Sequence, residues 1–298
     1  MISPNNKLVN WFLFVLISLI WGSSFILMKK GMFNTMGQPT LSAFHVAAIR
    51  ILSAGLVLLP IAILQIRKIP KGNGRYIIIS ALVGGFIPAF LFCIAETKID
   101  SSLAGFLNAL TPVFTIIVGL LFFDSAIQKK RMLGVAIAFL GMLILFLANQ
   151  PLNFQYLAYA GFVLVATICY AFNVNIVSRY LKETGSINIA AFGFGVMIIP
   201  SLLVLVFTGF FKLPLQQHDF LVSSLFSITL GVMGTAVASI LFYMLLKRAG
   251  TLFTSMVTYG MPFVALGWGL LDGEGVNALQ VLGLGVILGG VYLTNRQS

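Results

Sequence analysis

Charged residues are scarce in this chain. Of its 298 residues only 8% are Asp, Glu, Lys or Arg, whereas 59% are hydrophobic. A soluble fold needs a polar exterior, and so few charged residues cannot supply one. The composition therefore excludes a soluble globular fold and makes the bilayer the expected solvent. The apolar runs are about 17 to 25 residues long, which is the length of membrane-spanning helices and not of barrel strands.

Cysteine and histidine are also rare, at two residues each. Cys93 and Cys169 both fall within long apolar runs, so a disulfide framework is not expected. The two thiols have no neighbouring His in sequence, and no metal or cofactor is expected. No Gly-Lys pair occurs. The phosphate-binding G-x-x-x-x-G-K-[ST] pattern is thus absent, which excludes ATP-driven transport by this chain alone.

The apolar runs predict an all-α polytopic membrane protein with ten transmembrane helices. The first span is not expected to be a cleaved signal peptide, because its apolar run is long and Lys-Lys-Gly follows it. The ten expected spans are about 8–28, 41–66, 76–95, 102–123, 132–148, 156–178, 189–211, 221–246, 252–271 and 276–294.

The net charge of +11 follows the predicted loops. With a cytoplasmic N-terminus, most basic residues fall in inside segments, as the positive-inside rule requires, and both termini are cytoplasmic. The positions of the basic residues therefore reflect the membrane topology of the chain, and nucleic-acid binding is not expected. The inside set is Lys7, Arg67, Lys68, Lys71, Arg75, Lys129, Lys130, Arg131, Arg179, Lys182, Lys247, Arg248 and Arg296. The outside set is Lys29, Lys30, Lys98 and Lys212.

The two halves of the chain resemble each other. Asn-Ala-Leu-Thr-Pro-Val-Phe at 108–114 corresponds, 150 residues later, to Thr-Tyr-Gly-Met-Pro-Phe at 258–263. An acidic residue follows each proline by twelve positions, Asp124 and Glu274. Internal duplication in so apolar a chain is typical of transporters built from repeats.

The uncharged connection 149–155 separates five predicted spans from five others. Because five is odd, the second half enters the membrane from the opposite side, which predicts a 5+5 inverted repeat. The expected units are residues 1–148, the connecting loop 149–155, and residues 156–298.

Glycines recur in the fifth and tenth spans, at Gly134 and Gly141 and at Gly283 and Gly290. Small residues on helix faces allow close backbone approach in lipid. We interpret them as packing positions, either within the chain or in a homodimer, so that monomer and homodimer both remain open.

Interior prolines mark candidate breaks in the helices. Pro112 and Pro262 are equivalent in the repeat, and each removes a backbone donor, so both are candidates for gating or kinks. Asn108 and Thr111 precede Pro112, and Tyr259 lies in the corresponding segment of the second half. These polar groups either bind substrate or hydrogen-bond the carbonyls that proline frees.

Aromatic residues occupy the middle of the first and sixth spans. Helical spacing places Trp21, Ser24 and Met28 on one face. Tyr170 and Asn173 share a face of the equivalent span. Core packing and cavity lining are both compatible with this pattern.

Ionisable residues that break the repeat are the strongest functional candidates. Arg50 lies near the middle of the second span, where a buried charge is costly and must face protein or water. It either neutralises a substrate carboxylate or pairs internally, with Glu96 or with helix-end carbonyls. Glu96, near the outer end of the third span, is a possible coupling carboxylate. His45 is a second possibility, because histidine titrates near neutral pH.

These residues resemble a known family. Trp-Gly-Ser-Ser-Phe at 21–25, Arg50, the Pro112 and Pro262 segments and the Gly-Glu pair at 273–274 are similar to the EamA-type branch of the drug/metabolite transporter superfamily. The resemblance covers residues 11 to 294. Asp124 departs from the pattern, since Glu is common there, but it keeps the charge.

The resemblance implies a secondary transporter of the inner membrane that exports a small organic metabolite, such as an amino acid or another amphipathic solute, from a central cavity. It does not name the substrate. By this analogy the candidate cavity residues, beside Arg50, are Trp21, Asn108, Tyr170, Asn173, Tyr243 and Tyr259.

Two other classes of function remain as alternatives. A membrane-embedded enzyme on lipid or isoprenoid substrates needs clustered acidic or His residues, but the seven acidic residues are scattered, so an enzyme is not expected. A small-solute channel needs a ring of charges or a carbonyl filter.

Overall fold

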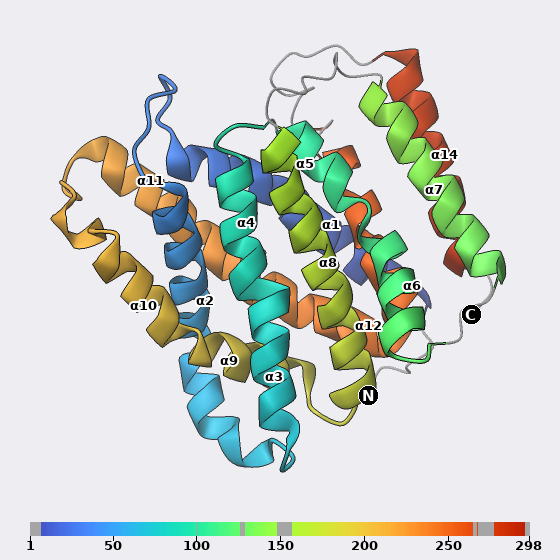
Figure 1. Ribbon diagram of the computed structural model, residues 1–298, viewed down its shortest axis with the longest axis horizontal. Coiled ribbons are helices and arrows are strands. Elements are labelled where there is room, and N and C mark those ends of the chain that lie inside the picture. Colours follow the sequence, from blue (N-terminus) through green and yellow to red (C-terminus); the bar gives the residue numbers. More distant parts are fainter. Residues whose placement is uncertain are drawn as a thin grey trace.

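The chain folds almost entirely as helices. The computed structural model describes residues 7–99, 101–125, 129–147, 157–264, 267 and 277–295 (Figure 1). In these ranges 6 helical segments are long and apolar enough to cross a membrane, and three shorter apolar helices accompany them. One isolated β-bridge pairs Phe33 with Pro39. The predicted class, an all-α polytopic membrane protein, is confirmed.

The described helices fall largely within the predicted apolar runs, but residues 218–264, predicted as parts of two spans, form one continuous apolar helical segment. In the first half they are α1 (Lys7–Met32), α2 (Ala43–Gln65), α3 (Asn73–Ala81), η2 (Leu82–Phe86), α4 (Ile87–Ala95), α5 (Ser101–Asn108), α6 (Thr111–Phe122) and α7 (Lys129–Leu147). In the second half they are α8 (Leu157–Tyr180), α9 (Ser186–Val196), α10 (Ile198–Phe207), α11 (His218–Thr229), η5 (Leu230–Val237), α12 (Ala238–Ser255), η6 (Met256–Tyr259) and α14 (Ala278–Asn295). The connection 149–155 and the Gly-Glu pair at 273–274 lie outside the described residues.

Both predicted proline breaks occur in the structure. The fourth span divides into α5 and α6, and Pro112 lies in the first turn of α6, where its missing N–H costs no helical hydrogen bond. In the second half, the 3₁₀ segment η6 ends at Tyr259, and helix resumes at Met261, directly before Pro262. The breaks leave irregular backbone in the middle of two membrane segments.

Two π-helical segments were not predicted. The π-helix η2 lies between α3 and α4, and η5 lies between α11 and α12. Gly85 in η2 and Gly234 in η5 are 149 positions apart, the offset at which the two halves resemble each other. A π-turn inserts one residue into a helix and loosens its hydrogen-bond ladder, frequently at functional sites.

Each half packs its first helix against the third span of the other. Helix α1 contacts α11, η5 and α12, whereas α8 contacts α3, η2 and α4. Side chains fill these contacts at the π-helices: a Cβ on Gly234 would lie 2.7 Å from the Ser24 hydroxyl of α1, and a Cβ on Gly84 would meet the Asn173 side chain of α8. Both π-helices are therefore fixed at the centre of the molecule.

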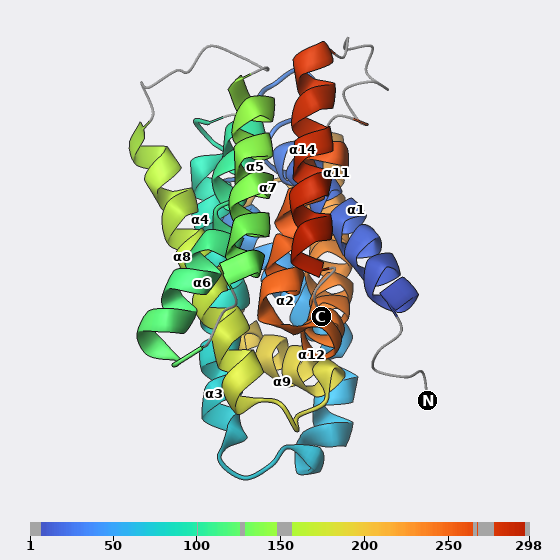
Figure 2. The same ribbon diagram turned by 90° about the vertical axis from the view of Figure 1, so that its right-hand side faces the viewer.

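Helices α7 and α14 form an extended pair at one side of the molecule (Figures 1 and 2). A Cβ on Gly141 would lie 2.8 Å from the carbonyl oxygen of Gly283, and one on Gly134 the same distance from that of Gly290. The backbones approach closely because these positions have no side chain. The predicted packing role is confirmed within a single chain.

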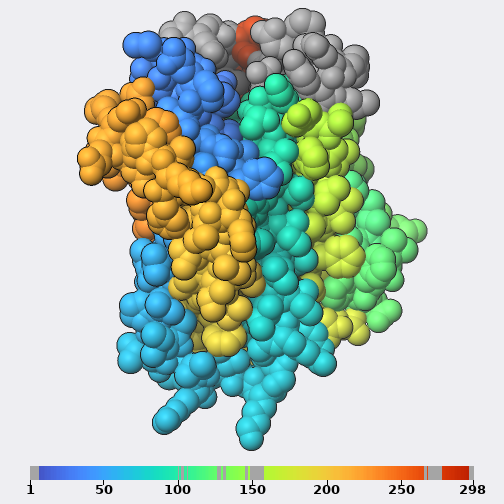
Figure 3. Space-filling model, turned by 60° about the vertical axis from the view of Figure 1, so that its left-hand side comes forward, coloured from blue at the N-terminus to red at the C-terminus, as the bar shows by residue number. Residues whose placement is uncertain are grey.

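The outer surface of the helices is apolar. Helix α10 covers α2 on the face shown in Figure 3. The exposed apolar side chains of α10 include Ile199, Leu203 and Phe207, which are 68%, 49% and 84% exposed. Large exposed apolar side chains in such density mark a surface that meets lipid.

Polar contacts gather at the two ends of the bundle. At one end, Lys247 Nζ donates to the carbonyl oxygens of Leu181 and Lys182, each at 3.0 Å, and Arg179 pairs with Asp124 at 3.4 Å. At the other end, Asn34 donates to Asp219 at 2.9 Å. Loops that are distant in sequence thus meet at the same end.

Candidate functional site

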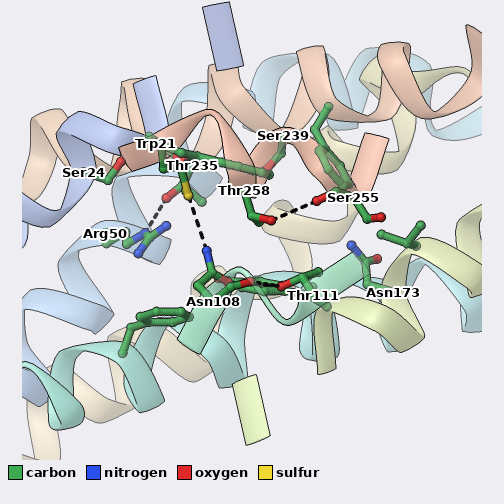
Figure 4. Close-up of a pocket in the computed structure, with 18 of the residues that line it drawn as sticks. Trp21, Ser24, Arg50, Asn108, Thr111, Asn173, Thr235, Ser239, Ser255 and Thr258 are labelled. Atoms are coloured by element: carbon green, nitrogen blue, oxygen red, sulfur yellow. Dashed lines mark hydrogen bonds between the residues drawn. The ribbon is translucent and has the colours of Figure 1, made fainter. Parts of the chain in front are cut away.

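A cavity lies where the broken helices and the π-helices meet (Figure 4). It holds about 870 Å³ between atoms, its open mouth included. The polar groups of its wall come from α1, α2, α5, α6, α8, η5, α12 and η6. They are Trp21, Ser24, Arg50, Asn108, Thr111, Tyr170, Asn173, Thr235, Ser239, Tyr243, Ser255 and Thr258. The predicted central cavity residues therefore converge, with the exception of Tyr259.

The face of α1 predicted from helical spacing lines the cavity. Trp21, Ser24 and Met28 are all in its wall. The indole Nε1 of Trp21 donates to the carbonyl oxygen of Gly234 at 3.0 Å, and its ring lies 5.1 Å from that of Phe242. Trp21 thus both lines the cavity and holds α1 against η5.

Helix α8 contributes the equivalent face. Tyr170 and Asn173 line the cavity, and the buried Ser80 hydroxyl donates to Asn173 Oδ1 at 2.5 Å. The Ser80 Oγ also lies 3.4 Å from the Tyr243 hydroxyl, which can donate to it because the Ser80 proton goes to Asn173. This network fixes Asn173 and Tyr243 between three membrane segments. Ser80 was not predicted, because a single serine in an apolar run carries no distinctive signal.

The two broken helices face each other across the cavity. Asn108 Nδ2 lies 3.4 Å from the Met261 sulfur, directly linking the two proline segments. Thr111 Oγ1 donates to the Asn108 carbonyl oxygen at 2.6 Å, and Thr258 Oγ1 donates to that of Ser255 at 3.1 Å. These hydroxyls thus donate to carbonyls near the breaks, as one of the two predicted alternatives has it, and they also line the cavity.

Arg50 provides the positive charge of the cavity. It lies about two turns after the start of α2, nearer to that end than the mid-span position expected from sequence. Its Nε donates to Thr235 Oγ1 at 2.7 Å. Its two terminal amino groups make no hydrogen bond to another described residue, and a guanidinium binds a carboxylate through such groups.

Arg50 and Glu96 do not form an ion pair. Within the described ranges the ion pair present joins Arg179 to Asp124. The charge of Arg50 still acts on Glu96 through space, but more weakly than that of Lys29. The internal pairing considered from sequence is thus not formed, because Glu96 caps the far end of α4 and faces a second space.

That second space is a polar vestibule, defined here as the opening between the ends of α1 and α4 and the starts of α5 and α11. It holds about 1860 Å³ and is open to solvent. Its charged and titratable groups are Lys29, Lys30, Glu96, Lys98, His218 and Asp219.

Two predicted site residues lie elsewhere. Tyr259 is fully buried, and its hydroxyl donates to the Val135 carbonyl oxygen at 3.4 Å. It faces α7 because η6 turns Ser255 and Thr258 toward the cavity instead. His45 completes the capping box of α2 with Ser42, and its Nε2 lies 3.3 Å from the Thr208 carbonyl oxygen. The imidazole therefore has a structural role at the start of the helix.

Several wall residues were missed by sequence reasoning. Thr235 and Ser239 belong to the eighth span, where nothing in the local pattern separates them from the other small residues. The signal was indirect: Gly234 is equivalent to Gly85 of the third span at the offset of the repeat. Without the helices placed, these glycines do not reveal which neighbours face inward.

Apolar helices of spanning length, broken at mid-membrane around a cavity lined by Arg50, are the features of a polytopic membrane transporter. The chain belongs to the EamA-like transporter family. The model of that family matches it twice, over residues 10–147 and 157–296.

Curated relatives extend over nearly the whole chain. A protein of Salmonella typhimurium named probable amino-acid metabolite efflux pump is 27% identical over 95% of this chain and 93% of its own length. Its namesake in Escherichia coli is 28% identical over 94% and 92%. The uncharacterized inner membrane transporter YedA of Escherichia coli is 27% identical over 92% and 87%. A solved crystal structure matches with a TM-score of 0.71 at 13% identity, covers 96% of both chains, and supports the fold alone.

Proposed function

We propose that this protein is a secondary transporter of the cytoplasmic membrane that exports a small organic metabolite, amino-acid-like or otherwise amphipathic. The solute binds in the central cavity, and alternating access exposes that cavity to either side. The family and the names of the relatives support a transporter; the chemistry of the cavity supports the class of solute.

The observation that carries the solute class is the side of Arg50 that bears its two terminal amino groups, which make no hydrogen bond to another described residue. A guanidinium with free amino groups in a partly buried wall attracts a carboxylate, since charge-assisted hydrogen bonds are strong there. Phe25, Phe92 and Phe242 give the same wall apolar surface. A solute with one carboxylate and an apolar part fits both features.

The architecture proposed for this activity has two five-helix units of opposite orientation, residues 1–148 and 156–298. The two family matches, the paired proline breaks and the equivalent π-helices support it. With both termini in the cytoplasm, the end of the bundle that carries Lys247 is inside and the polar vestibule is outside. Rocking of the units about Pro112 and Pro262 moves the opening from one side to the other.

The test is metabolite profiling of culture medium from cells that overproduce the protein. A solute should accumulate outside with the native chain and with Arg67→Gln, which removes an exposed cation far from the cavity. Export should fall at least tenfold with Arg50→Gln and recover in part with Arg50→Lys. Normal abundance of Arg50→Gln together with native export would remove Arg50 from the proposal.

Counterflow in proteoliposomes separates a carrier from a channel and an enzyme. A carrier shows saturable exchange of labelled for unlabelled solute, a channel shows no exchange stimulation, and an enzyme changes the solute chemically. Either of the last two results would overturn the proposal.

A further inference from the structure

Glu96 is a buried carboxyl that the structure leaves half satisfied. It is only 6% exposed at the end of α4. Its Oε2 accepts a long hydrogen bond from Ser101 Oγ at 3.4 Å, and its buried Oε1 has no hydrogen-bond partner among the residues that the structure describes. An ionised carboxylate in such a position costs much more than a neutral one. The geometry therefore favours the protonated form of Glu96 in this conformation.

Glu96 lies directly beyond a layer of aromatic rings. On α1, Phe25 lines the central cavity and Lys29, one turn later, lines the polar vestibule. On α4, Phe92 lines the cavity and Glu96, one turn later, lines the vestibule. On both helices, residues one turn apart thus line different spaces, the first the central cavity and the second the polar vestibule.

The rings in that turn touch one another. The centroids of Phe25 and Phe92 are 6.3 Å apart in an edge arrangement, and those of Phe92 and Tyr170 are 6.1 Å apart. Phe25 and Phe92 are both buried. Phe25 of α1 and Phe92 of α4 therefore lie at the boundary between the cavity and the vestibule, and Tyr170 of α8 packs against Phe92 on the cavity side. We call Phe25, Phe92 and Tyr170 the aromatic gate.

We propose that Glu96 is a proton-binding residue that sets the state of this gate: protonated Glu96 is buried and the gate is closed, whereas ionised Glu96 moves into the vestibule and the gate opens. The step is a simple proton exchange between the carboxyl oxygen and vestibule water. The assignment of the vestibule to the outside, and hence of the proton to the external medium, rests on the proposed function.

The direction of the pH dependence follows from proton linkage. Burial raises the pKa of Glu96 to about 8 from its ordinary value of 4.5, against the opposing effects of Lys29, Ser101 and Arg50. The closed state thus binds the proton more tightly than an open, hydrated state does. Stabilisation of the closed gate is complete below the ordinary pKa and is lost as the pH rises through about 8.

Other charged groups near Glu96 shape this response. Among the described residues, Lys29 and Lys30 approach from α1, Arg50 from α2, and His218 and Asp219 from α11. Lys98 follows on its own segment and Cys93 precedes it on α4. His218 is exposed at the start of α11, so its substitution is the matched control for a second titrating group.

Spin labels across the vestibule test the proposal without any substrate. The spin labels are attached at Thr35→Cys and Lys98→Cys, in a protein whose native cysteines are replaced by Cys93→Ser and Cys169→Ser. Double electron–electron resonance then measures the distance between the two labels in lipid nanodiscs. As the pH is raised from about 5.5 to about 9, the fraction of molecules with the longer label–label distance should increase, following the titration of Glu96. Glu96→Gln should keep the short separation throughout, whereas Glu96→Asp and His218→Gln should still respond.

Each outcome decides the matter. An unchanged distribution in the labelled protein over this range overturns the proposal, and so does a full response in Glu96→Gln. Glu96→Asp is the control for a structural effect of substitution at this position, because it keeps an ionisable group and should remain monodisperse. The measurement needs neither transport nor a known membrane orientation. Loss of export in the profiling experiment with a normal spin-label response would therefore refute the proposed function and not the gate.

Discussion

The indole nitrogen of Trp21 donates a hydrogen bond to the carbonyl oxygen of Gly234, 3.0 Å away, and so joins α1 to the π-helix η5. A π-turn loosens the internal ladder of a helix, which makes such a carbonyl accessible to a side-chain donor. Gly234 also permits the close approach, because a Cβ there would lie 2.7 Å from the Ser24 hydroxyl. One side chain from the first span thus stabilises an irregular turn in the eighth.

Trp21→Phe should destabilise the fold while it preserves most of the packing. The lost hydrogen bond leaves the Gly234 carbonyl without this donor, at a cost of about 1 kcal/mol. Thermal unfolding in detergent should show a fall of a few degrees. Trp11→Phe is the control, because Trp11 contacts the rings of Phe14 and Phe253 and donates no hydrogen bond to a described residue. Equal falls in both variants would contradict the role given to this hydrogen bond.

Thr235→Val should weaken solute binding through Arg50. The Thr235 hydroxyl accepts from Arg50 Nε at 2.7 Å and so fixes the direction of the guanidinium. Loss of a hydrogen bond to a charged group costs about 1.5 to 3 kcal/mol, which corresponds to a rise in KM of roughly tenfold or more.

The readout for Thr235→Val is the concentration dependence of counterflow in proteoliposomes, with the solute found by profiling. The maximal rate should change much less than KM, and Thr235→Ser, which keeps the hydroxyl, should restore native values. A proportional fall in rate at unchanged KM would show that Thr235 does not position Arg50.

Gly141→Leu should separate α7 from α14. A Cβ at Gly141 would lie 2.8 Å from the Gly283 carbonyl oxygen, so the helices must move apart, and overpacking of this kind costs about 1 to 3 kcal/mol. The fraction of monodisperse protein in size-exclusion chromatography should fall. Gly285→Leu is the matched control on α14, since a Cβ there meets no atom within 4 Å. Loss of the monodisperse peak in both variants alike would refute the packing role.

Reporter tags should show the two halves entering the membrane from opposite sides. A tag in the connection 149–155 is expected outside the cell, and a tag at the carboxyl end is expected inside, because five spans separate them. Protease accessibility in intact and permeabilised cells distinguishes the two locations. Both tags on one side of the membrane would refute the inverted arrangement.

The positions of the helices were predictable because their signal is local. Long apolar runs end at basic loops, and Pro112 and Pro262 mark the places where two spans break. The glycine contacts of α7 and α14 were predictable for the same reason, since Gly134 and Gly141 recur at helical spacing. Each of these features depends on residues adjacent in sequence.

The composition of the site was only partly predictable. Trp21 and Tyr170 were found because they interrupt apolar helices at equivalent positions. Tyr259 was predicted to line the cavity but does not. It lies in the 3₁₀ helix η6, where successive side chains point in directions that differ from those of an α-helix. Thr235 was missed, because its inward direction depends on the π-turn that precedes α12.

The sequence by itself determined a helical membrane protein, two breaks in its helices and a short set of polar candidates. This was possible because lipid requires every spanning backbone to satisfy its own hydrogen bonds. Only the tertiary structure decided that Arg50 lines the cavity while Glu96 lies beyond the aromatic gate in a separate vestibule. That separation arises from how α1, α2, α4 and α8 cross one another, and contacts between distant helices have no local signature in the chain.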